Sequence, residues 1–470
     1  MVTPAPALLL FIILRASTLS FEWDSIIRLT DNPSSQSLGY SYQRSIAIDL
    51  TGNVWVLWLD YRSSPEQVWS RKFDWTIGIW LPEEQITSSF VPSNTPSATC
   101  DQTGNLHLVW HTEHPLSKGI WYKRYDARQR RWLPDTLLEP TLYQKRFPVV
   151  ASRPNSDELH IVWCGNPDTA GVPQVFHKEF HPESGWLPAE PVSVFSSHYA
   201  ATVAVDSTGD LCVVWLGKDF NNLQEQVFCR CRINGVWTDI ELVSDFSGSF
   251  LQSSPVVAAG RDGNFHIAWE GLNSTTTYRQ IFYRLRTPTG FTPVFTVSQG
   301  LNLEQGSPSI SCRGENECHL VWRGKTEPDS GRYQLIYAFR DRFGRWSQPE
   351  LLTALPNGDV SRPAIVCDSE HGLHITWQDD SSGNLDIYYL RGQITPSGVN
   401  ITLDADHLNR RNRPSILSGD ALRGLSGTRA FFDPAGKTVQ TDRLPPGVYL
   451  VKGNSTAITF RKLVILPGGR

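Results

Sequence analysis

The sequence has no run of basic residues and no marked excess of either charge. It contains 43 Lys and Arg against 47 Asp and Glu, which leaves a formal net charge of −4. Proteins that bind nucleic acids or anionic membrane surfaces present dense positive charge, so neither is expected as a main partner. Nucleophile-elbow, P-loop and zinc motifs are also absent, so the sequence does not indicate any of the protein classes that these motifs identify.

Long hydrophobic runs are absent as well, and the longest lies at the N-terminus. The apolar run from Ala7 to Leu14 is too short to cross a bilayer but has the length of a signal-peptide core. Thr18 and Ser20 are small residues that suit cleavage near position 20. Residues 1–20 are therefore predicted to be a signal peptide, although no Lys or Arg precedes the run, and a retained N-terminal tail is the alternative.

Cysteine is sparse, at 8 residues, and shows no spacing typical of zinc. Cys312 and Cys318 flank RGENE in a predicted tight hairpin, where the geometry allows a cross-strand disulfide. Cys229 and Cys231 share one face of a predicted strand, and Cys212 lies on the strand before it. The sequence predicts no metal site and no cofactor.

What the chain does contain is an internal repeat. A short apolar segment that ends in tryptophan, such as NLHLVW or DLCVVW, occurs seven times at intervals of 52 to 55 residues. The closing tryptophans are Trp58, Trp110, Trp163, Trp215, Trp269, Trp322 and Trp377.

Each copy has four strand-like pieces. The first begins near a proline in five copies, a residue that suits the first position of a strand, and is followed by a turn such as DQTGN. The second piece ends in the closing tryptophan, and the third resembles GIWYKR or QIFYRL. In the fourth, an aromatic residue precedes a Ser or Thr by seven positions in all but one copy.

Four short antiparallel strands per repeat predict an all-β fold, a seven-bladed β-propeller over residues 21–405. A β-solenoid would need much shorter repeats. The last copy lacks the aromatic fourth piece, whereas Glu22–Thr30 has this pattern before the first copy begins. Glu22–Thr30 is therefore predicted to be the outer strand of the seventh blade, closing the ring without a free sheet edge.

The repeat ends after about Asp404, and residues 406–470 are predicted to form a small β-sandwich-like domain. Its pieces resemble the C-terminal sorting domain of the type IX secretion system, although the usual opening strands before Ser426 are missing. The resemblance implies recognition by that secretion machinery, and secretion or attachment at the outer surface of a bacterium. The matching segments are Ala430–Asp433 with Gly436 and Lys437, Pro446–Tyr449, and Arg461–Ile465.

The repeats over roughly residues 21–400 resemble those of sialidase-like propellers and the bacterial neuraminidase-repeat group. The resemblance implies a propeller and makes an exo-sialidase-type glycoside hydrolase one alternative. Such enzymes clamp a carboxylate with three arginines, for which Arg44, Arg146 and Arg362 are candidates. The Arg-Ile-Pro signature and the Asp-box are absent, and no Tyr/Glu pair stands out, so no catalytic residue is assigned.

Propeller topology brings the loops that enter each innermost strand and the loops after each second strand to one face. This rim is the predicted site, binding a glycan or a protein ligand, with a structural surface protein as a further alternative. The ligand-binding candidates are Arg44, Asp60, Arg62, Glu113, Arg146, Asp168, Lys218, Glu270, Arg323, Arg362 and Asp379. Aromatic residues that could stack on sugar rings are Tyr40, Tyr42, Phe220 and Tyr278.

Two expectations about partners complete this prediction. The chain is expected to be a monomer. The rim carboxylates leave a calcium ion in the channel as an open alternative, although no loop has a recognisable calcium spacing.

Five histidines share one repeat position, three residues before the closing tryptophan. They lie in separate blades and cannot share an ion, so each is predicted to form a hydrogen bond within its own blade. The tryptophans are predicted to fill the space between blades. The five histidines are His107, His160, His266, His319 and His374.

Overall fold

The computed structural model describes residues 20–395, apart from short gaps, and four strands near the C-terminus. The gaps are residues 41–43, 142, 168–171, 194–198, 219–223, 245–249, 261–262, 315, 328–330 and 369–371. The described residues form strands, turns and loops, and no helix among them is long and apolar enough to span a membrane. The chain divides into two units, Met1–Ser397 and Gly398–Arg470. The all-β prediction is confirmed.

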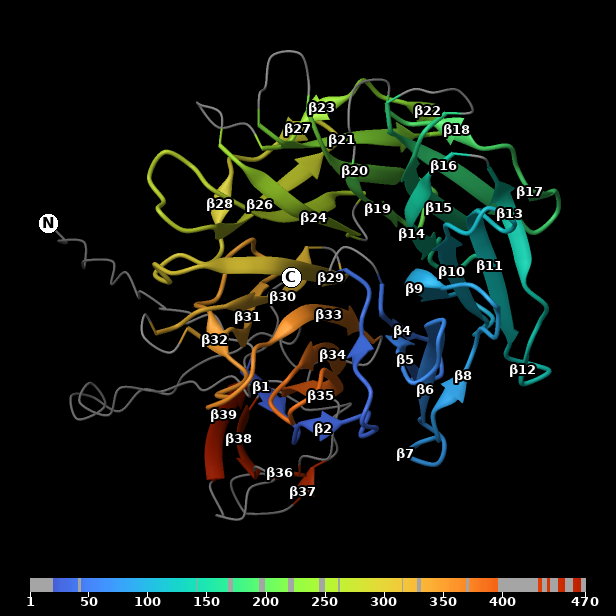
Figure 1. Ribbon diagram of the computed structural model, residues 1–470. Helices are drawn as coiled ribbons and strands as arrows, with labels where there is room; N and C mark the ends of the chain where they lie inside the picture. Colours follow the sequence, from blue (N-terminus) through green and yellow to red (C-terminus); the bar gives the residue numbers. More distant parts are fainter. Residues whose placement is uncertain are drawn as a thin grey trace, which may run out of the picture. The chain divides into compact units, whose positions relative to one another are not determined.

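Seven antiparallel sheets surround one axis in the first unit, as Figure 1 shows, and each sheet is a blade. The innermost strands of blades 1 to 7 are β4 (Ile46–Ile48, with β3, Gln36–Ser37), β9 (Asn94–Cys100), β14 (Lys145–Ser152), β19 (Tyr199–Val205), β24 (Gln252–Ala259), β29 (Gln305–Arg313) and β33 (Ser361–Cys367). The second strands are β5 (Val54–Asp60), β10 (Leu106–Thr112), β15 (Leu159–Gly165), β20 (Leu211–Gly217), β25 (Phe265–Gly271), β30 (Glu317–Gly324) and β34 (Gly372–Asp379).

The outer half of each blade has one long strand and shorter edge pieces. The third strands are β6 (Gln67–Asp74), β11 (Gly119–Asp126), β16 (Gln174–His181), β21 (Gln226–Ile233), β26 (Gln280–Thr287), β31 (Gln334–Arg340) and β35 (Asp386–Thr395). The edge pieces of blades 1 to 6 are β7 (Ile79–Trp80), β8 (Glu84–Gln85), β12 (Arg131–Trp132), β13 (Thr136–Pro140), β17 (Gly185–Trp186), β18 (Glu190–Pro191), β22 (Val236–Trp237), β23 (Glu241–Leu242), β27 (Gly290–Phe291), β28 (Phe295–Thr296) and β32 (Glu350–Leu351).

The N-terminal segment completes blade 7, as predicted. Strands β1 (Ser20–Trp23) and β2 (Ile27–Arg28) both pair antiparallel with β35, and Figure 1 shows these blue strands beside the orange strands of the last blade. The innermost strands also contact one another in an unbroken cycle, from β4 through β33 and back to β4. The ring is therefore closed by hydrogen bonds between the two ends of the propeller unit.

The second unit contains one described antiparallel sheet with the order β37-β36-β38-β39. Its strands are β36 (Ala430–Phe432), β37 (Thr438–Val439), β38 (Gly447–Lys452) and β39 (Phe460–Ile465). These strands coincide with the segments from which the sequence predicted the C-terminal β domain.

Tryptophans stabilise the ring at two positions, on the second strand of each blade and on the outer strand of most blades. The seven closing tryptophans of the second strands are at most 2 % exposed. The aromatic anchor of an outer strand packs across the interface onto the preceding blade, with ring centroids 4.9–6.1 Å apart in six blades, which confirms the predicted packing. The six contacts are Trp23–Tyr337, Trp80–Tyr389, Trp132–Trp55, Trp186–Tyr122, Trp237–His177 and Trp346–Tyr283.

The repeated histidines form hydrogen bonds within their blades, as predicted. In four blades the imidazole Nδ1 lies 2.7–2.8 Å from the hydroxyl of a tyrosine on the third strand. In blade 3 the partner is a second histidine, His177, 3.0 Å from His160. The tyrosine pairs are His107–Tyr122, His266–Tyr283, His319–Tyr337 and His374–Tyr389. Each histidine thus belongs to the interior of one blade.

Turns of the DQTGN type join the first two strands with the left-handed glycine that the sequence predicted. Gly104 has a φ of 80°, and Asp101 Oδ1 accepts hydrogen bonds from the backbone N–H groups of Thr103 and Asn105. The other carboxylate oxygen lies 2.9 Å from His107 Nε2. Burial alone would raise the pKa of Asp101, but the hydrogen bonds from His107, Asn105 and Thr103 lower it to about 2.

The innermost strands of blades 2 to 7 share a β-bulge opposite the closing tryptophan. One residue in each bulge has a φ of 48–57°, a left-handed conformation that is rare outside glycine. Proline follows it in five of the six, because a bulge tolerates a residue without an N–H. The prolines therefore lie inside the strands, which corrects the expectation that they begin them. The residues of positive φ are Thr95, Phe147, Ala200, Ser254, Ser307 and Arg362.

The predicted cross-strand disulfide is present in blade 6. Cys312 and Cys318 are directly opposed in the β29–β30 ladder, with a Cα–Cα distance of 4.2 Å. The bond therefore closes the hairpin between the innermost and second strands.

Candidate functional site

Apart from Arg44, the predicted rim residues for which coordinates are described lie on one face of the propeller. The strand register places the start of each innermost strand opposite the end of the second strand, as in the pairs Arg146–Cys164, Ser253–Glu270 and Gly306–Arg323. Lys218, which follows β20, is half-buried on the same face. Asp168, Tyr42 and Phe220 lie outside the described residues.

Asp60 and Asp379 anchor the closing tryptophans of blades 1 and 7. Both are at most 1 % exposed, and each accepts a hydrogen bond from a tryptophan indole N–H, at 3.0 Å from Trp58 and 2.9 Å from Trp377. Burial would raise the pKa of Asp60, but hydrogen bonds from Arg62 and Trp58 bring it below its usual value. Both carboxylates thus already have protein donors, and their role in ligand binding stays a prediction.

Arg62 links the rim to the outer part of blade 1. Its guanidinium donates to Asp60 at 2.7 Å and to Glu83 at 2.6 Å, and lies 3.9 Å from the ring centroid of Trp69. The hydrogen bond to Asp60 is the main cause that raises the pKa of Arg62, so the group stays charged. Arg62 is therefore held between two carboxylates and an aromatic ring at this edge.

Blades 5 and 6 contribute a second charged group. Glu270 is 6 % exposed, accepts a hydrogen bond from the backbone N–H of Ser307, and lies 4.0 Å from Arg279. The Arg323 guanidinium lies 4.5 Å from the ring centroid of Tyr333. This part of the rim therefore combines a carboxylate, two guanidiniums and an aromatic ring.

The channel mouth carries a connected group of aromatic and charged side chains from blades 1, 3 and 7. Arg362 lies 4.7 Å from the ring centroid of Tyr40, and its guanidinium donates to Ser37 Oγ at 2.7 Å and to the Leu38 carbonyl at 2.6 Å. Tyr40 is 40 % exposed and packs edge-on against Phe147 at 5.6 Å. We call Tyr40, Phe147 and Arg362 the mouth triad.

His111 and Glu113 extend this group into blade 2. The His111 ring lies 5.8 Å from Phe147, and its Nδ1 lies 2.7 Å from Thr95 Oγ1. Glu113 accepts a hydrogen bond from Arg146 and lies 3.8 Å from His111 Nε2. Burial lowers the pKa of His111 to about 4, so the imidazole is neutral at pH 7.

Sequence reasoning missed His111 and Phe147 as site residues. A signal for His111 was available, because it directly follows the closing tryptophan, the repeat position that the candidates Glu270 and Arg323 occupy in blades 5 and 6. No sequence signal marks Phe147, because only the bulge before Pro148 gives it a positive φ and a place at the mouth.

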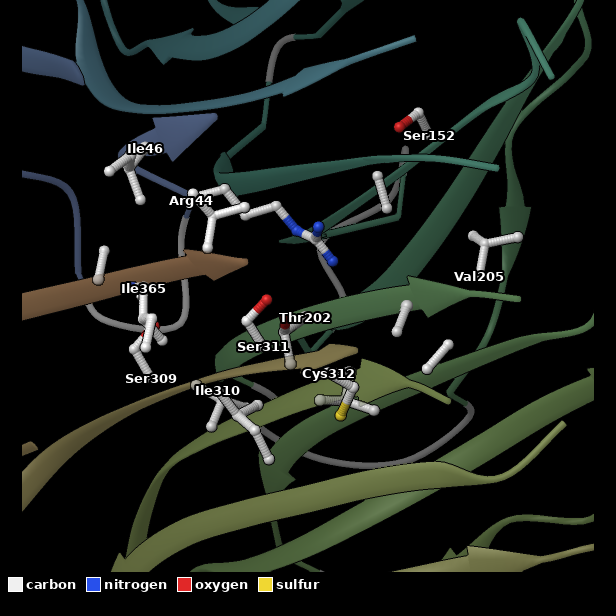
Figure 2. Close-up of a pocket in the computed structure, with 18 of the residues that line it drawn as sticks. Arg44, Ile46, Ser152, Thr202, Val205, Ser309, Ile310, Ser311, Cys312 and Ile365 are labelled. Atoms are coloured by element: carbon white, nitrogen blue, oxygen red, sulfur yellow. Dashed lines mark hydrogen bonds between the residues drawn. The ribbon is translucent and has the colours of Figure 1, made fainter. Parts of the chain in front are cut away.

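The three arginines proposed for a sialidase clamp have separate partners. Arg146 pairs with Glu113, and Arg362 binds Ser37, Leu38 and the Tyr40 ring. Arg44 instead points into the axial cavity, as Figure 2 shows, and donates to the Val203 carbonyl at 3.0 Å. The described contacts therefore hold each guanidinium in a different environment.

Among the residues that the structure describes, four groups of three side chains have ligand atoms close enough to hold a metal ion, within 4.8 Å of one another. Two of them occupy equivalent positions in neighbouring blades, and three thiols would suit a soft ion such as Zn²⁺ or Cu⁺. The groups are Cys212/Cys229/Cys231, His160/His177/Glu179, His266/Cys312/Cys318 and Glu158/Glu179/His181. Cys312 and Cys318 are joined as a disulfide, so their sulfurs are already bonded to each other.

Comparison with known proteins supports the fold. No protein-family model and no curated protein matches the sequence. Among solved structures, the chain is similar to the polysaccharide lyase Uly1 at 9 % identity and a TM-score of 0.54, over 79 % of this chain and 99 % of that one. A fungal alcohol oxidase of the AA5 family, in complex with copper, matches at 12 % identity and a TM-score of 0.50, over 94 % and 99 %.

The NanB sialidase of Streptococcus pneumoniae is also similar, at 10 % identity and a TM-score of 0.40, over 77 % of this chain and 70 % of that one. Identities this low show a shared fold alone. The seven blades of this chain are established by its own sheet topology.

Proposed function

We propose that the protein binds an acidic glycan at the channel mouth. The mouth triad is the observation that carries this proposal, because it joins an exposed tyrosine ring to a fixed guanidinium. An aromatic face offers apolar contact to the C–H face of a sugar ring, while charged groups beside it set orientation and specificity.

The charges near the triad favour a ligand with a carboxylate or sulfate group. Arg146 and Arg362 both lie in this group, where Glu113 pairs with Arg146. Guanidiniums recognise such anions through paired hydrogen bonds. The similarity in fold to a polysaccharide lyase agrees with a glycan ligand.

A glycan array tests the proposal, using the full chain and the Tyr40→Ala variant. We expect wild-type protein to retain acidic glycans, and Tyr40→Ala to weaken binding at least about tenfold, the equivalent of about 1.4 kcal/mol. Phe343→Ala is the matched control, since Phe343 is 65 % exposed beside Arg342 in a turn between outer strands. Equal binding by wild type and Tyr40→Ala would contradict the role of the triad.

An exo-sialidase-type hydrolase and a structural surface protein are the alternatives. Purified protein incubated with a fluorogenic sialoside, beside Arg362→Ala, separates the first from simple binding. Release of the fluorophore that Arg362→Ala abolishes would indicate catalysis. A chain that binds no glycan and releases no fluorophore would fit a structural role.

We also propose that the protein is exported as a monomer and sorted through its C-terminal domain. The support is the apolar N-terminal run and the similarity of the tail segments to type IX sorting domains. Deleting residues 406–470 should leave the chain inside the outer membrane, whereas the full chain should reach the surface or the medium. Cell fractionation with an antibody to the propeller would measure this difference.

A further inference from the structure

The innermost strands enclose a cavity of about 190 Å³ on the propeller axis, shown in Figure 2. Its lining residues come from six of the seven blades, and most are apolar or small. Arg44 is the single charged residue among these lining residues, and its side chain extends into the space between Thr202, Ser311 and Ser152. The cavity therefore has one positive charge near its middle.

No carboxylate compensates the charge of Arg44 among the described residues. Its guanidinium makes one hydrogen bond, to the Val203 carbonyl at 3.0 Å, although a guanidinium carries five N–H donors. The surrounding protein lowers the pKa of Arg44 to about 10, so the group remains protonated at neutral pH. Arg44 is half-buried and has no carboxylate partner among the described residues, and an arginine does not relieve such a charge by losing its proton.

Two of the hydroxyl groups that line the cavity accept hydrogen bonds from backbone N–H groups. Ser309 Oγ accepts the backbone N–H of Ile365 at 3.2 Å, and Ser311 Oγ accepts that of Cys367 at 3.1 Å. Each of these hydroxyls also carries a proton that it can donate to a ligand. Thr202 also lines the cavity. A guanidinium and several O–H donors, without a carboxylate, suit a bound anion.

Water alone would solvate Arg44 but would not neutralise it. A cavity of this size has room for several water molecules of about 30 Å³ each, or for a small anion with fewer waters. We propose that the axial cavity is an anion site, in which Arg44 with Thr202, Ser309 and Ser311 binds chloride or a carboxylate. This proposal does not depend on the glycan proposed for the mouth.

Chloride-35 NMR line broadening tests the site directly in the full chain. Wild-type protein should broaden the chloride signal, and acetate should reverse the broadening by competition. Arg44→Met should abolish the effect, whereas Arg128→Met, which removes an exposed arginine, should keep it. Chloride broadening that is equal in wild type and Arg44→Met would overturn the proposal.

Competition experiments identify the class of anion that the site binds. Glucuronate that displaces chloride in wild type, while glucose does not, would identify a sugar carboxylate as a ligand. Displacement by acetate alone would identify a free small anion, and either outcome supports the site.

If Arg44→Met does not fold, Thr202→Val and Ser311→Ala retain the charge and should each weaken chloride binding. The thermal midpoint should rise with chloride concentration in wild type, because an anion that binds only the folded state stabilises it. A midpoint that does not respond to chloride, together with unchanged binding in both hydroxyl variants, would also overturn the proposal.

Discussion

Blades 3 and 4 place different chemistry at the same three interior positions. In blade 3 these are His160, His177 and Glu179, and in blade 4 they are Cys212, Cys229 and Cys231, with the first and third residues opposed in both ladders. All six are at most 7 % exposed.

The polar set of blade 3 is held by a chain of hydrogen bonds. His160 lies 3.0 Å from His177, His177 lies 3.0 Å from Glu190, and Arg232 lies 2.7 Å from Glu179. The thiols of blade 4 contact one another instead, and burial raises the pKa of Cys212. A buried polar group needs partners and a thiol does not, so the blade accepts either set if volume and hydrogen bonding are satisfied.

The largest expected effect follows from acidification. Burial lowers the pKa of His160 and His266 to about 3, and that of His111 to about 4. The unfolded chain binds these protons near pH 6.5 and the folded chain does not, so stability falls as the pH drops from about 6.5 to about 4. Three such groups together give a slope of about 4 kcal/mol per pH unit.

Urea unfolding at pH 7, 6 and 5 would measure this slope. Replacing His160 and His177 together by cysteine makes blade 3 resemble blade 4, and should lower the slope by about 1.4 kcal/mol per pH unit. An unchanged slope in this double variant would contradict the proposed difference between blades 3 and 4.

The next largest effect concerns Trp237, the tryptophan of blade 4 that packs against blade 3. Trp237 packs edge-on against His177 at 5.6 Å, and Trp237→Ala should lower the free energy of unfolding by about 3 kcal/mol. Trp75→Ala serves as the control, because Trp75 is 37 % exposed, and should cost about 1 kcal/mol. Chemical denaturation of both variants gives the two values, and equal losses would argue against the role of the inter-blade contact.

A smaller effect tests whether the blades are interchangeable. Cys229→Tyr introduces a larger side chain and a hydroxyl without the histidine partner, and should destabilise by about 1–3 kcal/mol. Adding Cys212→His supplies the pair found in blades 2, 5, 6 and 7, and should recover at least about 0.5 kcal/mol of that loss. Strictly additive effects in this double-mutant cycle would show that the two positions are independent.

The smallest effect lies in the bulge of blade 4. Ala200 has a φ of 50°, so Ala200→Gly should raise the free energy of unfolding by up to about 1 kcal/mol. Ala201→Gly, at the next position in the same strand, should lower it by about 0.5–1 kcal/mol. Thermal denaturation of the pair measures the difference, and the same sign for both would contradict the backbone argument.

Much of the fold could be predicted because its signals are local and repeated. The spacing of the closing tryptophans predicted seven blades, and the displaced Glu22–Thr30 pattern predicted the closure of the ring. The same strand logic predicted the Cys312–Cys318 disulfide and the hydrogen bonds of the blade histidines. The prolines were placed less well, since a bulge depends on the partner strand as well as on the residue itself.

For the candidate site, the sequence could predict only which face of the propeller it occupies. The propeller topology predicted that Asp60 and Glu270 lie at the rim. It did not predict which groups donate hydrogen bonds to their carboxylates there. The mouth triad joins residues from blades 1, 3 and 7, which lie 107 and 215 residues apart (147 − 40 and 362 − 147). No local pattern encodes such a contact.

The sequence by itself determined the number of blades, their strand order and the way the ring closes, because each repeat carries its own alternation, turns and aromatic anchors. Only the tertiary structure decided which side chains meet at the axis. Arg44 has no sequence neighbour that explains its environment, and only the closed ring surrounds it with six blades and leaves its charge without a carboxylate among the described residues. The surroundings of Arg44 are a property of the assembled ring, since they arise between blades rather than within a repeat.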